Sequence, residues 1–178
     1  MNKIAFSAHS IGKRTGPHED ACVGDPHTGI YIVADGMGGD RHGNLASHLA
    51  AELISRVIHS SSIHTESTWL FPKKGGLSLE ENFLRMAFLH ANTKIISRAQ
   101  HESKLGWMGC SAIALLAIPE EPALVIVGVG NCRAYRFRKG ILTQLTLDAS
   151  LAHYKKCLPP SPFQNIPLNF LGKSPSVE

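Results

Sequence analysis

Residues Ile30–Ser47, with the sequence IYIVADGMGGDRHGNLAS, decide how the rest of the chain is interpreted. The apolar residues Ile30–Ala34 predict a short buried strand, which leads to one carboxylate, Asp35, and then to a turn rich in glycine. Glycines let the backbone turn sharply and approach a ligand closely. An Asp in this position suits a hard metal cation bound by oxygen atoms, although an isolated Asp-Gly pair is more often an ordinary turn.

A second acidic group precedes this stretch. Residues 13–21, KRTGPHEDA, place Arg14 a few residues before the adjacent carboxylates Glu19 and Asp20. Adjacent side chains of an extended segment point to opposite faces, so only one of the two can face a given pocket directly. From the spacing alone, a solvated acidic turn explains this pair more often than a binding site does.

The remaining residues predict two helices and several strands. Apolar residues recur at steps of three and four in residues 44–59 and 78–100, and Ser78 and Glu81 have the spacing of a capping box. Apolar runs joined by short turns predict strands at residues 4–9, 111–118, 123–129, 133–137 and 141–145. Because short hairpins build antiparallel sheet, the predicted fold class is α+β.

The composition narrows the classes of protein. The 178 residues, of which 43% are hydrophobic and 18% charged, predict a single globular domain over residues 1–178. The net charge of +4 is spread without a basic run, and no apolar stretch is long enough to cross a membrane, so we expect neither a nucleic-acid nor a membrane partner. Four cysteines without paired spacing and a start unlike a signal peptide favour a cytoplasmic location.

Several segments can be compared with known families: residues 13–21 (KRTGPHEDA), 33–39 (VADGMGG), 107–111 (WMGCS), 127–151 (VGVGNCRAYRFRKGILTQLTLDASL) and 165–178 (NIPLNFLGKSPSVE). In this order they resemble the motifs of the PP2C (PPM) family of metal-dependent serine/threonine phosphatases, in its bacterial form. The similarity extends over nearly the whole chain.

The resemblance implies an antiparallel β-sandwich flanked by α-helices, with a site for two Mn²⁺ or Mg²⁺ ions at one end. The substrate would be a phosphoserine or phosphothreonine protein, hydrolysed by a metal-activated water. In the family pattern Asp35 bridges the two metals, the Gly36 carbonyl ligates one of them, and Asp20 holds a metal or its water. Glu19 would act through a coordinated water, and Arg14 would bind the phosphate oxygens.

The chain departs from the family pattern in three places. Asn131 stands where the family has an Asp, and Ala149-Ser150 stands where Asp-His-Ser is usual. No Asp follows Asp148, so the two later metal-binding Asp residues of the family have no counterpart. We therefore expect a domain without the C-terminal part of the family fold, whose open sheet edges a second chain could cover.

Three other interpretations remain at this point. The first is a catalytically compromised domain that binds a phosphoprotein or another partner. The second is a cysteine-dependent phosphatase, since Cys132 and Arg138 have C-x5-R spacing, although the residues between them are bulky and contain no glycine. The third, a small nucleotide-binding domain, has little support because residues 36–39 match neither a P-loop nor a dinucleotide motif.

Overall fold

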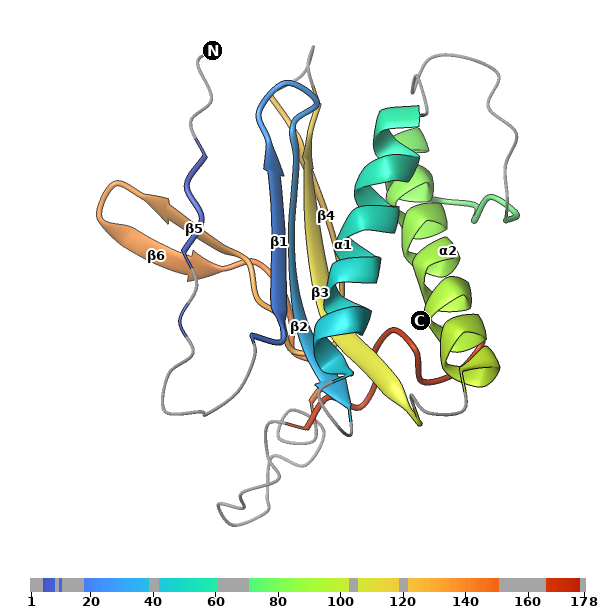
Figure 1. The fold of residues 1–178 in the computed structure, drawn as a ribbon. Helices are drawn as coiled ribbons and strands as arrows, with labels where there is room; N and C mark the ends of the chain where they lie inside the picture. Colours follow the sequence, from blue (N-terminus) through green and yellow to red (C-terminus); the bar gives the residue numbers. More distant parts are fainter. Residues whose placement is uncertain are drawn as a thin grey trace, which may run out of the picture.

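The structure is a computed structural model that describes residues 5–8, 10, 18–38, 42–60, 71–102, 106–118, 122–150 and 166–176. Its centre is a four-stranded antiparallel sheet with the strand order β1-β2-β3-β4 (Figure 1). The strands are β1 (Asp20–Asp25), β2 (Ile30–Gly38), β3 (Met108–Ala117) and β4 (Leu124–Val129). Each strand is therefore hydrogen-bonded to its neighbour in sequence order, as expected for consecutive hairpins and a helical excursion between β2 and β3.

Both long helices, α1 (Gly43–Ser60) and α2 (Leu79–His101), lie on one face of this sheet (Figure 1). The side chains of Ile30, Ile32 and Ala34 on β2 are fully buried beneath them, because alternate residues of a strand share a face. The predicted capping box of α2 is present: the Glu81 N–H donates to Ser78 Oγ at 3.1 Å, and the Ser78 N–H donates to Glu81 Oε2 at 2.6 Å. None of the helices in the described part of the chain could span a membrane.

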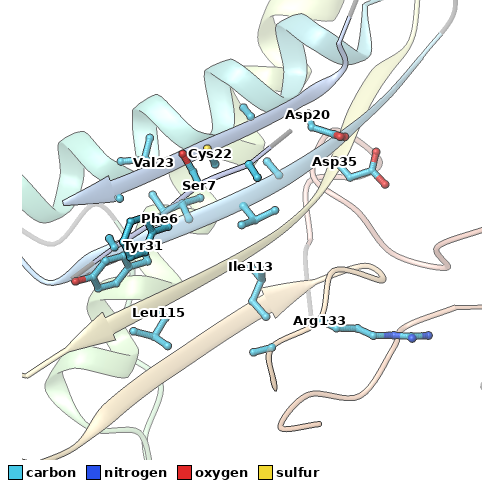
Figure 2. A pocket seen from close by; sticks show the side chains of 18 residues that line it. Phe6, Ser7, Asp20, Cys22, Val23, Tyr31, Asp35, Ile113, Leu115 and Arg133 are labelled. Carbon is cyan, nitrogen blue, oxygen red and sulfur yellow. The ribbon is translucent and has the colours of Figure 1, made fainter. Parts of the chain in front are cut away.

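Among the described residues, no helix covers the opposite face of the sheet. We call it the open face and define it by the side chains that β1, β2 and β3 direct away from the helices, which are Cys22, Tyr31, Val33, Ile113 and Leu115, with Asp20 and Asp35 at one end. A cavity of about 580 Å³ lies over this face (Figure 2). Residues 5–8 and Arg133 form its other walls.

A two-stranded hairpin, β5 (Tyr135–Arg138) and β6 (Ile141–Gln144), projects away from the central sheet (Figure 1). Its two-residue turn is Lys139-Gly140, with φ angles of 51° and 78°. Positive φ at both positions is the geometry that matches the twist of a hairpin, so the turn predicted there is confirmed.

Residues 166–176 return to the beginning of β3, at the end of the sheet that carries Asp35. Leu171 is fully buried, and its N–H and carbonyl pair with the carbonyl and N–H of Cys110 at 2.9 and 3.0 Å. Asn92 of α2 holds the same segment, because its Nδ2 donates to the Ser174 carbonyl at 2.8 Å and its Oδ1 accepts from the Gly172 N–H at 2.8 Å. A buried amide with these partners fixes the segment against α2.

Two local expectations are wrong. Residues 5–8, within the strand predicted at 4–9, join no sheet in the described part of the chain. Strand β2 does not end at Ala34 but continues through Asp35 to Gly38, since residues 108–111 of β3 pair with it along this length. Gly36 and Gly38, which suggested a turn, lie within the strand. Because they have no side chain, the backbones of Glu19, Gly43 and Trp107 can approach it closely. The expected sandwich has a second sheet. The β5–β6 hairpin is the two-stranded sheet that the described residues contain besides the central one.

Candidate functional site

Two carboxylates lie together at one end of the open face. Asp20 on β1 and Asp35 on β2 are direct register partners in the antiparallel ladder. Cross-strand partners project their side chains from the same face of a sheet, so both carboxylates face the cavity. Figure 2 shows them side by side at one end, with Tyr31 and Phe6 toward the other.

Glu19 lies on a different side of the sheet end from Asp20, as the alternation of an extended segment predicted. A β-carbon added to Gly43 would lie 2.9 Å from Glu19 Oε1, so this carboxylate reaches toward the first residue of α1. The N-terminus of a helix favours a negative charge. The Glu19 carbonyl also accepts a hydrogen bond from the Gly36 N–H at 2.9 Å.

Gly36 is enclosed by backbone. A β-carbon at this position would lie 2.0 Å from the Gly43 carbonyl oxygen and 2.5 Å from that of Glu19. The structure thus brings Glu19, Asp20, Asp35 and Gly36 to the same end of the sheet. Arg14, the fifth predicted site residue, lies outside the described residues.

Ser111 and Asn131 belong to the same neighbourhood, although neither was among the predicted site residues. Ser111 is the register partner of Asp35 on β3, and its buried hydroxyl donates to Asn131 Oδ1 at 2.9 Å. The turn after β4 can approach so closely because Gly130 has φ of +92°, and a β-carbon there would lie 2.3 Å from Ser111 Oγ. The register of β2 and β3, which the sequence does not specify directly, is what places Ser111 here.

Cys132 is adjacent to the two carboxylates, and it stays protonated at neutral pH. Burial, together with the negative charge of Asp35, raises the pKa of the Cys132 thiol to about 12. A cysteine-dependent phosphatase needs a thiolate on a loop that opens a helix, whereas Arg138 of the same C-x5-R spacing lies at the end of strand β5. The cysteine-phosphatase interpretation is therefore wrong.

Arg133 forms one wall of the cavity and is held by an acid. Its Nε donates to both oxygens of Asp148, at 2.8 and 2.9 Å, its Nη2 donates to Oδ2, and its Nη1 donates to the Tyr135 hydroxyl at 3.3 Å. These contacts with Asp148 and Tyr135 raise the pKa of Arg133 further above neutrality. The forked ion pair fixes the chain between the end of β4 and the hairpin.

The donors at this end of the sheet fit a hard divalent cation by chemical type. Carboxylate and carbonyl oxygens are the ligands that Mg²⁺ and Mn²⁺ favour, and Mg²⁺ in particular keeps several waters. The number of donors is small, however: the described residues contain no group of three or more His, Cys, Asp or Glu side chains arranged to hold a metal. Two carboxylates that face one cavity form the core of the candidate site.

The chain is similar to known protein phosphatases. The family model described as protein phosphatase 2C matches residues 10–156. The serine/threonine phosphatase stp of Listeria monocytogenes is 36% identical over 159 residues, which cover 84% of this chain and 58% of the relative. The serine/threonine protein phosphatase PstP of Mycobacterium tuberculosis is 30% identical over 119 residues, covering 67% of this chain and 20% of the relative.

Solved structures show the same fold. The PPM Ser-Thr phosphatase MsPP of Mycobacterium smegmatis superimposes with a TM-score of 0.73 at 23% identity, covering 96% of this chain and 68% of that one. The catalytic domain of PstP in complex with two manganese ions superimposes with a TM-score of 0.62 at 25% identity, covering 82% and 55%. The expected α+β fold is thus confirmed, while the chain spans less than two thirds of the curated relatives it matches.

Proposed function

The chain belongs to the protein phosphatase 2C family, and we propose that it acts in the metal-dependent hydrolysis of phosphoserine and phosphothreonine in proteins. The observation that carries the proposal is the register pairing of Asp20 with Asp35, which directs two carboxylates to one end of a cavity. Both residues lie within the part of the chain that matches the family model.

In this proposal Asp35 and Asp20 hold the cations, Mn²⁺ or Mg²⁺, with the Gly36 carbonyl as a further ligand. Glu19 orients a coordinated water from the side of α1, and Arg14 binds the phosphate oxygens of the substrate. Bound divalent cations polarise a phosphoryl group and lower the pKa of water. The partner is accordingly a phosphoprotein, with no nucleic acid or membrane involved. The free thiols of Cys22, Cys110 and Cys132 support a reducing compartment such as the cytoplasm.

The test is Mn²⁺-dependent release of phosphate from a phosphothreonine peptide. Asp35→Asn and Asp20→Asn should each reduce turnover by about 100-fold or more, because each removes one of the two negative charges that face the cavity. Asp25→Asn is the matched control: it makes the same substitution on β1, at the opposite end of the strand from Asp20, and should leave turnover unchanged. Chelation by EDTA should abolish the reaction.

A second candidate function, in which the domain binds a phosphoprotein without hydrolysing it, is not favoured by the relatives, which are named serine/threonine phosphatases. Its one support is that the described residues contain no cluster of three metal-ligating side chains. Fluorescence anisotropy with a labelled phosphothreonine peptide separates the two functions. Phosphate-dependent binding by folded protein without phosphate release would favour the binding module over the enzyme.

A further inference from the structure

A side chain of α1 holds the segment that leads into β1. Asn44, the second residue of α1, donates from Nδ2 to the His18 carbonyl at 2.6 Å. A carbonyl can only accept a hydrogen bond, so the nitrogen of the amide must face it and the amide oxygen cannot. The two residues are 26 positions apart, and the contact is partly buried. This hydrogen bond therefore links the helix to a strand end that is distant in the sequence.

The segment held in this way carries two of the candidate metal-binding residues, because His18 directly precedes Glu19 and Asp20. Asp20 begins β1, and its pairing with Asp35 is the last in the ladder between β1 and β2. Beyond that pair, a hydrogen bond from the Gly36 N–H to the Glu19 carbonyl, at 2.9 Å, continues the register. The end of a strand opens more readily than its middle, so a further contact at this point matters for the position of both carboxylates.

The helix that makes the contact is itself firmly placed. Ser47 is fully buried, and its hydroxyl donates to the Asn44 carbonyl at 3.1 Å. Gly43, at the start of α1 beside the end of β2 (Figure 1), is so close to that strand that a β-carbon on it would lie 2.7 Å from the Gly36 carbonyl carbon. Asn44 thus extends from a rigid element, and it positions the segment at His18 relative to β2.

We propose that Asn44 is a positioning residue of the candidate metal site. Its hydrogen bond to His18 sets where the carboxylate of Asp20 lies relative to that of Asp35. This role rests on the proposed function, in which the two carboxylates hold divalent cations. Mg²⁺ requires nearly ideal octahedral geometry, so a displaced carboxylate binds it less well. Groups that orient metal ligands without touching the metal typically change metal affinity by about 10–100-fold.

The first test is the affinity for Mn²⁺, measured by isothermal titration calorimetry without substrate. Asn44→Ala removes the donor and should weaken Mn²⁺ binding by about tenfold or more. Alanine is the best helix former, so the substitution does not weaken α1 through helix propensity. Asn44→Gln keeps an amide donor and should bind Mn²⁺ more tightly than Asn44→Ala. His48→Ala changes an exposed residue one turn farther along α1; it is the matched control and should not change the affinity.

The second test follows the segment itself and needs no metal. The Gly36 N–H donates to the Glu19 carbonyl, so loosening of residues 18–20 should speed hydrogen exchange of the Gly36 amide. We expect an increase of about tenfold or more in Asn44→Ala, measured by NMR. The amide of Ile32, whose register partner Val23 lies within β1, is the internal reference and should exchange at an unchanged rate.

The two measurements distinguish failure of this role from failure of the proposed function. If the unmodified chain binds Mn²⁺ and Asn44→Ala binds it equally well, the role of Asn44 is overturned and the proposed function stands. The role is also overturned if Asn44→Gln binds no more tightly than Asn44→Ala, or if the exchange rate of Gly36 is unchanged. An unmodified chain that binds no Mn²⁺ would overturn the proposed function, and the metal-site role of Asn44 with it, even if Gly36 exchanged faster in the variant.

Discussion

The backbones of Gly36 and Gly43 are in direct contact where β2 passes the first residue of α1. A β-carbon on Gly36 would lie 2.0 Å from the Gly43 carbonyl oxygen, and one on Gly43 would lie 2.7 Å from the Gly36 carbonyl carbon. No side chain fits at either position, and backbone cannot move aside as a flexible side chain can. This contact sets the distance between the start of the helix and the end of the sheet that carries Asp35.

We expect Gly36→Ala to destabilise the fold by about 1–3 kcal/mol or more, because the added methyl group forces β2 and α1 apart. Thermal unfolding followed by circular dichroism measures the effect. Gly75→Ala is the matched control, since a β-carbon at Gly75 meets nothing within 4 Å. A variant of Gly36 with unchanged stability would show that α1 begins farther from the strand than the structure places it.

Asn131 provides a test of charge at the candidate site. It accepts a hydrogen bond from Ser111, the register partner of Asp35, and it is neutral. Asn131→Asp keeps the size of the side chain and adds a carboxylate, so we expect Mn²⁺ to bind about tenfold more tightly. Isothermal titration calorimetry measures this without reference to turnover. Thr93→Asp adds the same charge at an exposed position of α2 and should not change the affinity.

His59 and Asp25 should make stability depend on pH. The His59 ring nitrogens face two acceptors, the Ser55 carbonyl at 2.7 Å and Asp25 Oδ2 at 2.9 Å. The Ser55 carbonyl and then Asp25 raise the pKa of His59 above 6.5, while the hydroxyl of Thr28 and then the N–H of His27 lower the pKa of Asp25 to about 2. Both nitrogens are satisfied as donors only in the imidazolium form.

The sign of the pH effect follows from these directions. The contribution of His59 is complete below pH 6.5 and is lost as the pH rises through its higher folded-state pKa, whereas that of Asp25 is complete above 3.8 and is lost toward 2. His59→Gln should therefore lower Tm most between about pH 4 and 6.5, with a smaller difference once the pH exceeds the folded-state pKa of His59. His101→Gln is the control, because His101 makes the same contact with the Ser97 carbonyl but is in none of the described ion pairs.

Asn92→Ala tests the attachment of residues 166–176. The substitution leaves the Gly172 N–H and the Ser174 carbonyl without their buried partner, at an expected cost of about 1–3 kcal/mol in the free energy of unfolding. Urea denaturation measures it, with the exposed neighbour Thr93→Ala as the control. An Asn92 variant as stable as the Thr93 variant would contradict a structural role for this segment.

Local signals in the sequence predicted the helices and the hairpin. The Ser78–Glu81 capping box and the Lys139-Gly140 turn depend on neighbouring residues only, so both could be read from the chain. Asp35 lies within a strand because β2 pairs there with residues 108–111, more than seventy positions away. The residues next to Asp35 in the sequence do not predict that pairing. For the same reason Ser111 was not recognised as a neighbour of Asp35.

The candidate site was only partly predictable. The family motifs placed Asp20 and Asp35 in it, and the register of β1 and β2 brings them together. Alternation along the chain correctly separated Glu19 from Asp20. The role assigned to Arg14 stays a prediction, because Arg14 lies outside the described residues.

The attachment of Leu171 and Ser174 to the interior has a consequence for how the protein is made. Asn92 and Ser174 are 82 residues apart, and at about 5–20 residues per second a ribosome needs roughly 4–16 s to synthesise what lies between them. Until residues 166–176 have been made, α2 and the beginning of β3 lack the segment that Asn92 and Cys110 bind. A chain interrupted in this interval exposes the apolar surface that Leu171 covers, so it is more prone to aggregate than the finished chain.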